Sequence, residues 1–156
     1  MNTPALGRHQ SHLEGMALKL HLVATLAMAG VIWTIQLVHY PLMARVGRDS
    51  FRPYHIGHSA RITLLVGPLM LAELGTGVFL LLSPGALAMG PLAASMALLA
   101  VIWVTTALVQ VPQHRALGAG YSGPMVRRLV LGNWVRTVAW TARAAVLMMI
   151  VPWPSP

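Results

Sequence analysis

The chain alternates long apolar segments with short polar ones. Four segments are largely apolar over about 20 residues, the length that an α-helix needs to cross the hydrocarbon core of a bilayer, and they cover residues 16–39, 60–82, 91–111 and 129–151. Each is followed within two residues by a proline, which favours the end of a helix: Pro41, Pro84, Pro112 and Pro152. The apolar pattern shows no internal repeat. It predicts an all-α fold, a polytopic transmembrane up-down four-helix bundle that forms one domain over residues 1–156.

Positive charge is concentrated in two of the three connections. The segments 43–59 and 113–128 hold six arginines and one acid, Asp49, whereas residues 83–90 and the tail after Val151 are uncharged. Positively charged connections usually stay in the cytoplasm. The pattern therefore predicts a multi-pass protein of the inner (cell) membrane, with both arginine-rich connections in the cytoplasm and both termini outside it.

Composition narrows the class of protein. Hydrophobic residues make up 56% of the chain and charged residues only 9%, whereas a soluble domain has about 25% charged residues. The partner that covers so much apolar surface is the lipid bilayer. A net charge of +8 could indicate nucleic acid, but the arginines lie between apolar segments, so we expect no nucleic-acid partner. The lack of cysteine excludes disulfides, Cys-ligated zinc, iron–sulfur clusters and thiol catalysis.

Two charged residues lie deep in the predicted spans. Arg143 is near the middle of the fourth segment, where an isolated charge is costly, and Glu73 is the one acid within a predicted span. Counted at about 1.5 Å per residue, both lie about 20 Å from the cytoplasmic starts of their helices. We therefore predict a Glu73–Arg143 ion pair, which either fixes helix packing or serves as a proton relay or substrate clamp. Arg136 and Asn133 share the helix face of Arg143.

Four histidines map to the cytoplasmic ends of three helices, where a bundle would bring them together. They are His39, His55, His58 and His114. Imidazole suits iron, copper and zinc, so we predict that His39, His58 and His114 ligate haem iron or another transition metal, with His55 as a further ligand or a supporting residue. Alternatively, these are interfacial histidines that hydrogen-bond to loops or lipid phosphates.

Other polar residues lie at the same level as the histidines. Arg61 and Arg136 could hold haem propionates or an anionic substrate by charge-assisted hydrogen bonds, and Asn133 could assist. Tyr54 is a candidate catalytic residue, together with Glu73, Arg136 and Arg143. The third span ends in a polar stripe formed by Trp103, Thr106, Gln110, Gln113 and His114, of which only His114 is assigned a role.

The sequence of the first span resembles that of other membrane proteins. The span contains Lys19-Leu20-His21 and Trp33 and is followed by Tyr40-Pro41-Leu42-Met43. This resembles the first helix of small four-helix bacterial inner-membrane proteins, among them the haem-binding membrane-type protoporphyrinogen oxidase. The resemblance covers residues 19–43 and implies a four-helix membrane fold that binds haem. It assigns no role to a particular residue.

Three functions are compatible with these features. The first is a membrane-embedded redox protein or enzyme, an oxidoreductase that holds haem or a His-ligated metal near the cytoplasmic face and acts on a lipophilic small molecule such as a quinone, porphyrin or lipid. The second is a small transporter or channel unit that works as a homo-oligomer. The third is a non-catalytic subunit of a larger membrane complex.

Overall fold

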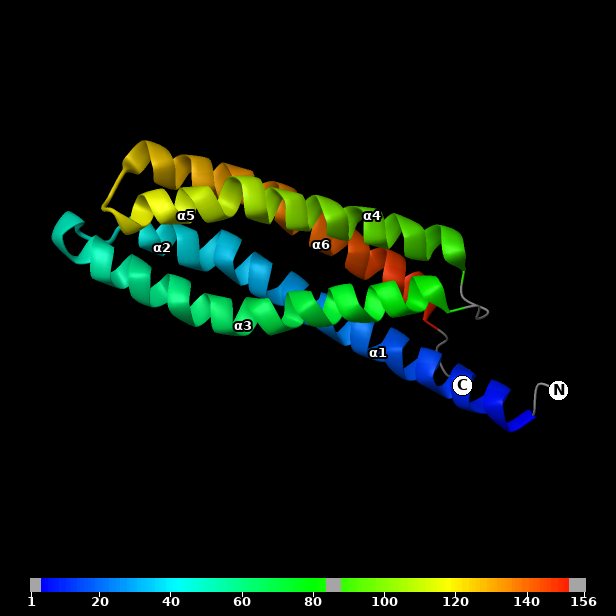
Figure 1. Ribbon diagram of the computed structural model, residues 1–156. Helices are drawn as coiled ribbons and strands as arrows, with labels where there is room; N and C mark the ends of the chain where they lie inside the picture. The colour runs from blue at the N-terminus through cyan, green and yellow to red at the C-terminus, as the bar shows by residue number, and fades with distance from the viewer. Residues whose placement is uncertain (1–3, 84–87, 152–156) are drawn as a thin grey trace.

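The computed structural model describes residues 4–83 and 88–151, and over these residues every regular element is a helix (Figure 1). Pro84 and Pro152 lie outside the described residues. The elements are α1 (Pro4–Thr34), η1 (Ile35–His39), α2 (Tyr40–Met43), α3 (Arg48–Leu82), α4 (Met89–Thr105), η2 (Thr106–Gln110), α5 (Val111–Gly118) and α6 (Gly123–Ile150).

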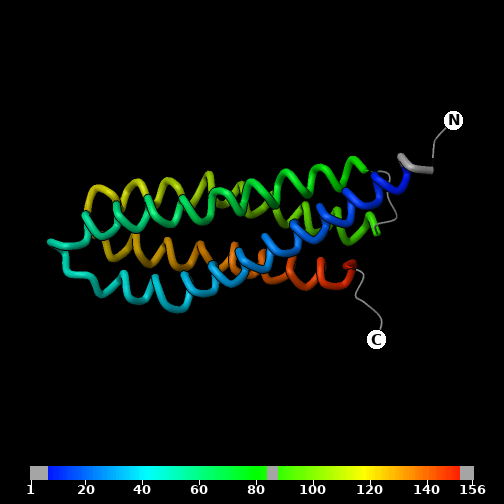
Figure 2. The backbone as a smooth tube through the Cα atoms, turned by 90° about the horizontal axis from the view of Figure 1, so that it is seen from below, coloured from blue at the N-terminus to red at the C-terminus, as the bar shows by residue number. Residues whose placement is uncertain are grey.

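These elements form four long helical rods that lie side by side (Figure 2). α1, η1 and α2 make one continuous rod, α4, η2 and α5 make another, and α3 and α6 are the other two. Residues 44–47 and 119–122 turn the chain at one end of the molecule, which we call the turn end (Figure 1). α3 packs mainly on α1, and α6 packs on α4 and α1, whereas α3 makes fewer contacts with α4 and α5.

Three helical stretches are long and apolar enough to cross a membrane: residues 7–43, 48–82 and 89–118. Their outward side chains are apolar and uncovered; Leu64 is 78% exposed and Leu108 is 71% exposed. The chain therefore fits a multi-pass membrane protein whose helices contact lipid. The predicted fourth span falls in α6, which is not among the three because polar residues on its buried face, such as Asn133 and Arg143, lower its hydropathy.

The helices extend beyond the predicted spans. The second begins at Arg48 instead of residue 60, and the third rod runs on to Gly118 instead of ending at 111. Pro41 and Pro112 do not end their rods, contrary to the prediction. Each follows a π-helical turn, in which the backbone bond reaches five residues back, as from the Tyr40 N–H to the Ile35 carbonyl. This wider turn relieves the clash that a proline ring makes with the carbonyl four residues before it.

The two hairpins share a pattern that the apolar analysis missed. Leu37-Val38-His39-Tyr40-Pro41 in the first rod matches Leu108-Val109-Gln110-Val111-Pro112 in the third, and a glycine follows each proline at the same distance, Gly47 and Gly118. In both rods the π-helical turn covers the corresponding residues. Each hairpin thus contains a π-helical turn followed by a proline near the turn end.

The buried side chains form a larger apolar cluster towards the turn end and a smaller one towards the other end. The helices pack closely at Gly77 near the smaller cluster: a Cβ atom there would lie 2.3 Å from Met96 Sδ, so the flexible end of the Met96 side chain would have to move. The same Cβ would lie 3.0 Å from the His21 ring. The missing side chain thus lets α3 approach α1 and α4 where the buried charges lie.

Candidate binding site and buried polar network

Glu73 and Arg143 form an ion pair in the middle of the molecule, and both side chains are fully buried. This confirms the predicted pair. The Glu73 carboxylate also accepts hydrogen bonds from the Thr25 hydroxyl at 2.8 Å and from the Trp140 indole N–H at 3.0 Å. A buried charge is tolerated when it is paired and its remaining lone pairs are satisfied, and Glu73 meets both conditions.

The Arg143 guanidinium reaches two further helices. Its Nε donates to the Ser95 carbonyl at 3.1 Å on α4, and one Nη lies 3.2 Å from His21 Nε2 on α1. A guanidinium can only donate, so His21 Nε2 accepts and the His21 proton is on Nδ1, which donates to the Thr76 hydroxyl at 2.9 Å. The network ties α1, α3, α4 and α6 together through Glu73 and Arg143.

A second polar layer lies nearer the turn end. Asn133 donates to the Gln36 amide oxygen at 2.7 Å, and Arg136 donates to the Asn133 amide oxygen at 3.4 Å. The Arg136 guanidinium also lies over the Trp140 ring, 5.1 Å from its centroid. Arg136 is only 7% exposed, its Nε has no hydrogen-bond partner, and no acid among the described residues pairs with it. Its charge is therefore unbalanced within the described part of the chain.

The four predicted histidines do converge, and we call them the histidine cluster. His39 stacks on His58 with ring centroids 3.8 Å apart, and His55 stacks on His114 with centroids 5.2 Å apart. His58 and His114 are 6.3 Å apart, which links the two pairs. The Tyr54 hydroxyl lies 3.5 Å from His39 Nδ1.

The geometry of the histidine cluster does not form a metal site. A metal ion lies in the ring plane of each imidazole that binds it, at about 2 Å from the nitrogen, so two rings stacked face to face cannot both point at one ion. In the part of the chain that the structure describes, no group of three or more His, Asp or Glu side chains could hold a metal ion. Joint ligation by His39, His58 and His114 would require these rings to turn out of their stacks.

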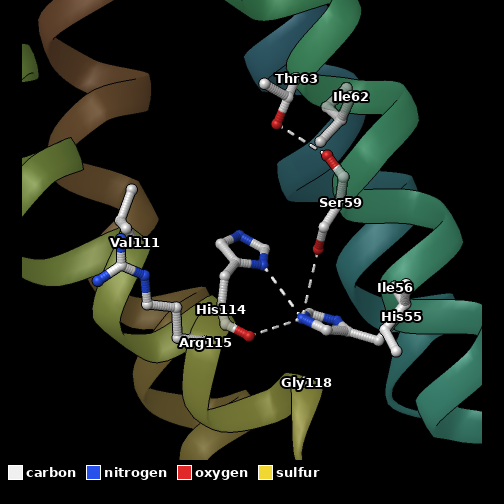
Figure 3. Close-up of a pocket in the computed structure, with 9 residues that line it drawn as sticks. All are labelled: His55, Ile56, Ser59, Ile62, Thr63, Val111, His114, Arg115 and Gly118. Carbon is white, nitrogen blue, oxygen red and sulfur yellow. Dashed lines mark hydrogen bonds between the residues drawn. The ribbon is translucent and has the colours of Figure 1, made fainter.

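Three pockets border the histidine cluster: one is lined by His39 and His58, and the other two share His114. The first of these two, which we call the turn-end pocket, has a volume of about 340 Å³ and lies between α3 and α5 (Figure 3). Its polar side chains are those of His55, Ser59, Thr63, His114 and Arg115. His55 and His114 project towards each other from α3 and α5, and His55 Nε2 lies 3.4 Å from His114 Nδ1 (Figure 3).

The second pocket, which we call the intramembrane pocket, has a volume of about 350 Å³ and lies mainly between α3 and the α4–η2–α5 rod, with Ile35, Tyr40 and Arg136 from the other two rods. Its lining is largely apolar, but it also contains polar atoms that are buried and have no hydrogen-bond partner in the described structure. These are Trp103 Nε1, Thr106 Oγ1, both amide atoms of Gln110, and Arg136 Nε. Buried polar atoms are nearly always paired because an unpaired one is costly. The pocket is therefore lined by an unusual number of buried polar atoms that lack a hydrogen-bond partner.

The predicted site residues are only partly brought together. His58, His114 and Arg136 line the intramembrane pocket, whereas Arg61 lies on the exposed side of α3 and is not among its lining residues. That Arg61 and Arg136 hold anionic groups stays a prediction, and of the two only Arg136 lines this pocket. Asn133 contacts Arg136 from behind the pocket.

Trp103, Thr106 and Gln110 were visible in the sequence as part of a polar stripe, but they received no role. Their position could have identified them, because they lie in the turn-end half of an otherwise apolar span, on the face that packs against α3.

Comparisons with known protein families, with curated proteins and with solved structures find no match for this chain. Its function is therefore inferred from its own residues.

Proposed function

We propose that this protein is a four-helix transmembrane bundle, with both termini outside the cytoplasm, that binds a lipophilic small molecule with an acidic head group in the intramembrane pocket. Three helices are apolar enough to span a bilayer. α6 packs on two of the three membrane-spanning rods and directs its polar residues inward. The arginine-rich turns favour a cytoplasmic turn end.

The observation that carries the proposal is that four side chains with unpaired buried polar atoms line one pocket. Arg136 selects the charge of the ligand, because a buried guanidinium without an acid partner is costly in a membrane and an anion would balance it. Its fork of N–H donors suits a carboxylate. Trp103 and Gln110 offer further donors to the oxygens of a head group.

The rest of the pocket suits a hydrophobic body. Ile62, Val66 and Met70 contribute apolar walls, and Leu71, which is 61% exposed, places the rim at the outer surface of α3. α3 makes fewer contacts with α4 and α5 than with α1. A ligand dissolved in the bilayer would therefore reach the pocket from the side.

The test is a binding measurement with a brominated long-chain carboxylic acid, since bromine quenches tryptophan fluorescence on contact. We expect saturable quenching in lipid nanodiscs that is mostly lost in Trp103→Phe. Trp33→Phe is the control, because Trp33 lies against Trp134 and Thr141, outside the pocket.

Arg136→Gln tests the charge selection in the same assay. Hydrogen bonds to a charged group contribute about 1.5–3 kcal/mol, so we expect a loss in affinity of about ten- to a hundredfold, whereas Arg61→Gln on the exposed side of α3 should bind normally. The methyl ester of the probe enters lipid equally well but has no charge. Equal binding of acid and ester, or no effect of Arg136→Gln, would contradict the proposal.

Haem or a His-ligated metal is a second candidate, which requires the stacked rings to turn; it is favoured by the convergence of four imidazoles, two of which line the same pocket as Arg136. Haem iron takes one or two axial imidazoles, and Arg136 could hold a propionate. A Soret band or stoichiometric metal in the purified protein, lowered by His→Ala at positions 39, 58 and 114 but not by His12→Ala, would support it. A colourless, metal-free protein that binds the brominated acid would leave only the first candidate.

A further inference from the structure

The outer surface of α6 has a hollow near the turn end that the proposed function does not use. Its volume is about 460 Å³, and it is lined by Arg127 and Arg128 together with Gly123, Pro124 and Leu131. Both arginine side chains are exposed, and neither forms an ion pair with an acid among the described residues. The hollow therefore presents two adjacent positive charges that the described part of the chain does not balance.

Farther along α6, the same outer surface is apolar. Leu131, Val135, Val138 and Met149 are all exposed, and their spacing places them on one face of the helix. The opposite side of α6 packs on α4 and α1. Counted at about 1.5 Å per residue, the apolar strip from Leu131 to Met149 is about 27 Å long, close to the thickness of the hydrocarbon core. A cationic end thus continues into an apolar strip of membrane length.

The charged end suits a phosphate group. A guanidinium donates two parallel hydrogen bonds to phosphate oxygens, and adjacent residues on a helix project about 100° apart, so a phosphate between Arg127 and Arg128 can accept from both. A head group that also contains an ammonium group would bring a positive charge back to the hollow. The charge of the hollow is therefore complementary to a head group with a net negative charge.

We infer that this hollow binds a phospholipid with a net anionic head group, whose phosphate lies between Arg127 and Arg128 and whose acyl chains lie along Leu131, Val135 and Val138. The apolar strip favours a lipid over a free phosphate ion, which would contact the arginines alone. The inference does not rest on the proposed function, because it uses the outer surface of α6 and not the intramembrane pocket.

The test measures the quenching of Trp134 fluorescence in nanodiscs of zwitterionic phosphatidylcholine. The two probes are phosphatidylglycerol and phosphatidylcholine with the same brominated acyl chains, so only the head groups differ. Trp134 is exposed and lies about two turns from Arg127 on the same face of α6. One arginine near an anionic lipid contributes about fivefold in affinity, so we expect a preference for phosphatidylglycerol of about ten- to thirtyfold. The corresponding quenching should be missing in Trp134→Phe.

Variants of the arginines test the position of the site. Arg127→Gln/Arg128→Gln should abolish the preference, and each single variant, which disturbs the protein less, should lower it about fivefold. The matched control is Arg45→Gln/Arg52→Gln, which removes the same charge from exposed positions of the other hairpin at the turn end. This control should keep most of the preference.

Two results would overturn the inference. The first is equal quenching of the native protein by the two brominated lipids. The second is an equal loss of preference in the two double variants, which would show that the lipid responds to the total charge of the turn end and not to the hollow. Neither result depends on Trp103 or on a long-chain acid, so the proposed function can fail while this site stands, and the reverse.

Discussion

Arg136 and Arg143 lie on the same face of α6, about two turns apart, yet their surroundings differ. Arg143 is bonded to Glu73, Ser95 and His21, so its charge and its donors are satisfied within the described chain. Arg136 lines a pocket and keeps an unpaired Nε. The first arginine therefore has all its partners within the bundle, whereas the second keeps a donor for the ligand that we propose.

At this residue scale, breaking the Glu73–Arg143 pair should be costly. Removing one partner leaves the other charge buried and unpaired, so Glu73→Gln and Arg143→Gln should each lower the free energy of unfolding by about 3–5 kcal/mol. The double variant should lose less than the sum of the two. Denaturant unfolding in detergent measures this, with Asp49→Asn on the exposed start of α3 as the control. Additive losses would show that the two side chains do not depend on each other.

At the scale of elements, the π-helical turns decide which side chains reach the pocket. η2 contains Thr106 and ends at Gln110, and Pro112 and His114 follow in α5. A π-helical turn holds one more residue than an α-helical turn. The side chains that follow it are therefore rotated about the helix axis relative to those that precede it. η1 does the same for His39 in the first hairpin.

Deletion of Leu108, which faces outward, tests this role. The shortened η2 should become α-helical and turn Thr106 and Gln110 relative to each other by about 100°. Pro112 would then clash with the preceding turn at a cost of about 3 kcal/mol, so the deletion is combined with Pro112→Ala. We expect a folded protein that no longer binds the brominated acid, while Leu108→Ala with Pro112→Ala still binds it. Normal binding by the deletion variant would show that the π-helical turn is not needed.

For the whole molecule, the two turns lie at one end (Figure 1). The histidine cluster and the turn-end pocket lie towards that end, because their residues come from η1 and from the parts of α3 and α5 next to the turns. The side of the membrane to which this end faces decides the compartment that the turn-end pocket adjoins. The arginines of both turns favour the cytoplasm.

Reporter fusions test this orientation. A reporter inserted near Gly120 should be active in the cytoplasm, and a reporter at the C-terminus should be active outside it, because positive charge near the turns resists translocation. A cytoplasmic reporter at the C-terminus would reverse the orientation. The pockets would stay as described, but the turn-end pocket would adjoin the other compartment.

The sequence by itself determined the helical class, the membrane environment, the Glu73–Arg143 pair and the convergence of the histidines. These follow from quantities that are counted along the chain: the length of apolar segments, and the depth of a residue at a fixed rise per residue. A buried charge also requires a partner of opposite sign, and Glu73 was the one acid in a predicted span.

The tertiary structure decided how each helix is rotated about its axis and which side chains touch one another. Neither follows from the depth of a residue in the membrane. Whether Arg61 or Arg136 faces the pocket depends on how each helix is turned about its axis, and the π-helical turns change that rotation within a rod. The stacking of His39 on His58 and the open pocket beside Trp103 and Gln110 depend on how closely α3 packs on each of its neighbours. Such packing is set by side chains from several helices together, so it appears only once the helices are assembled.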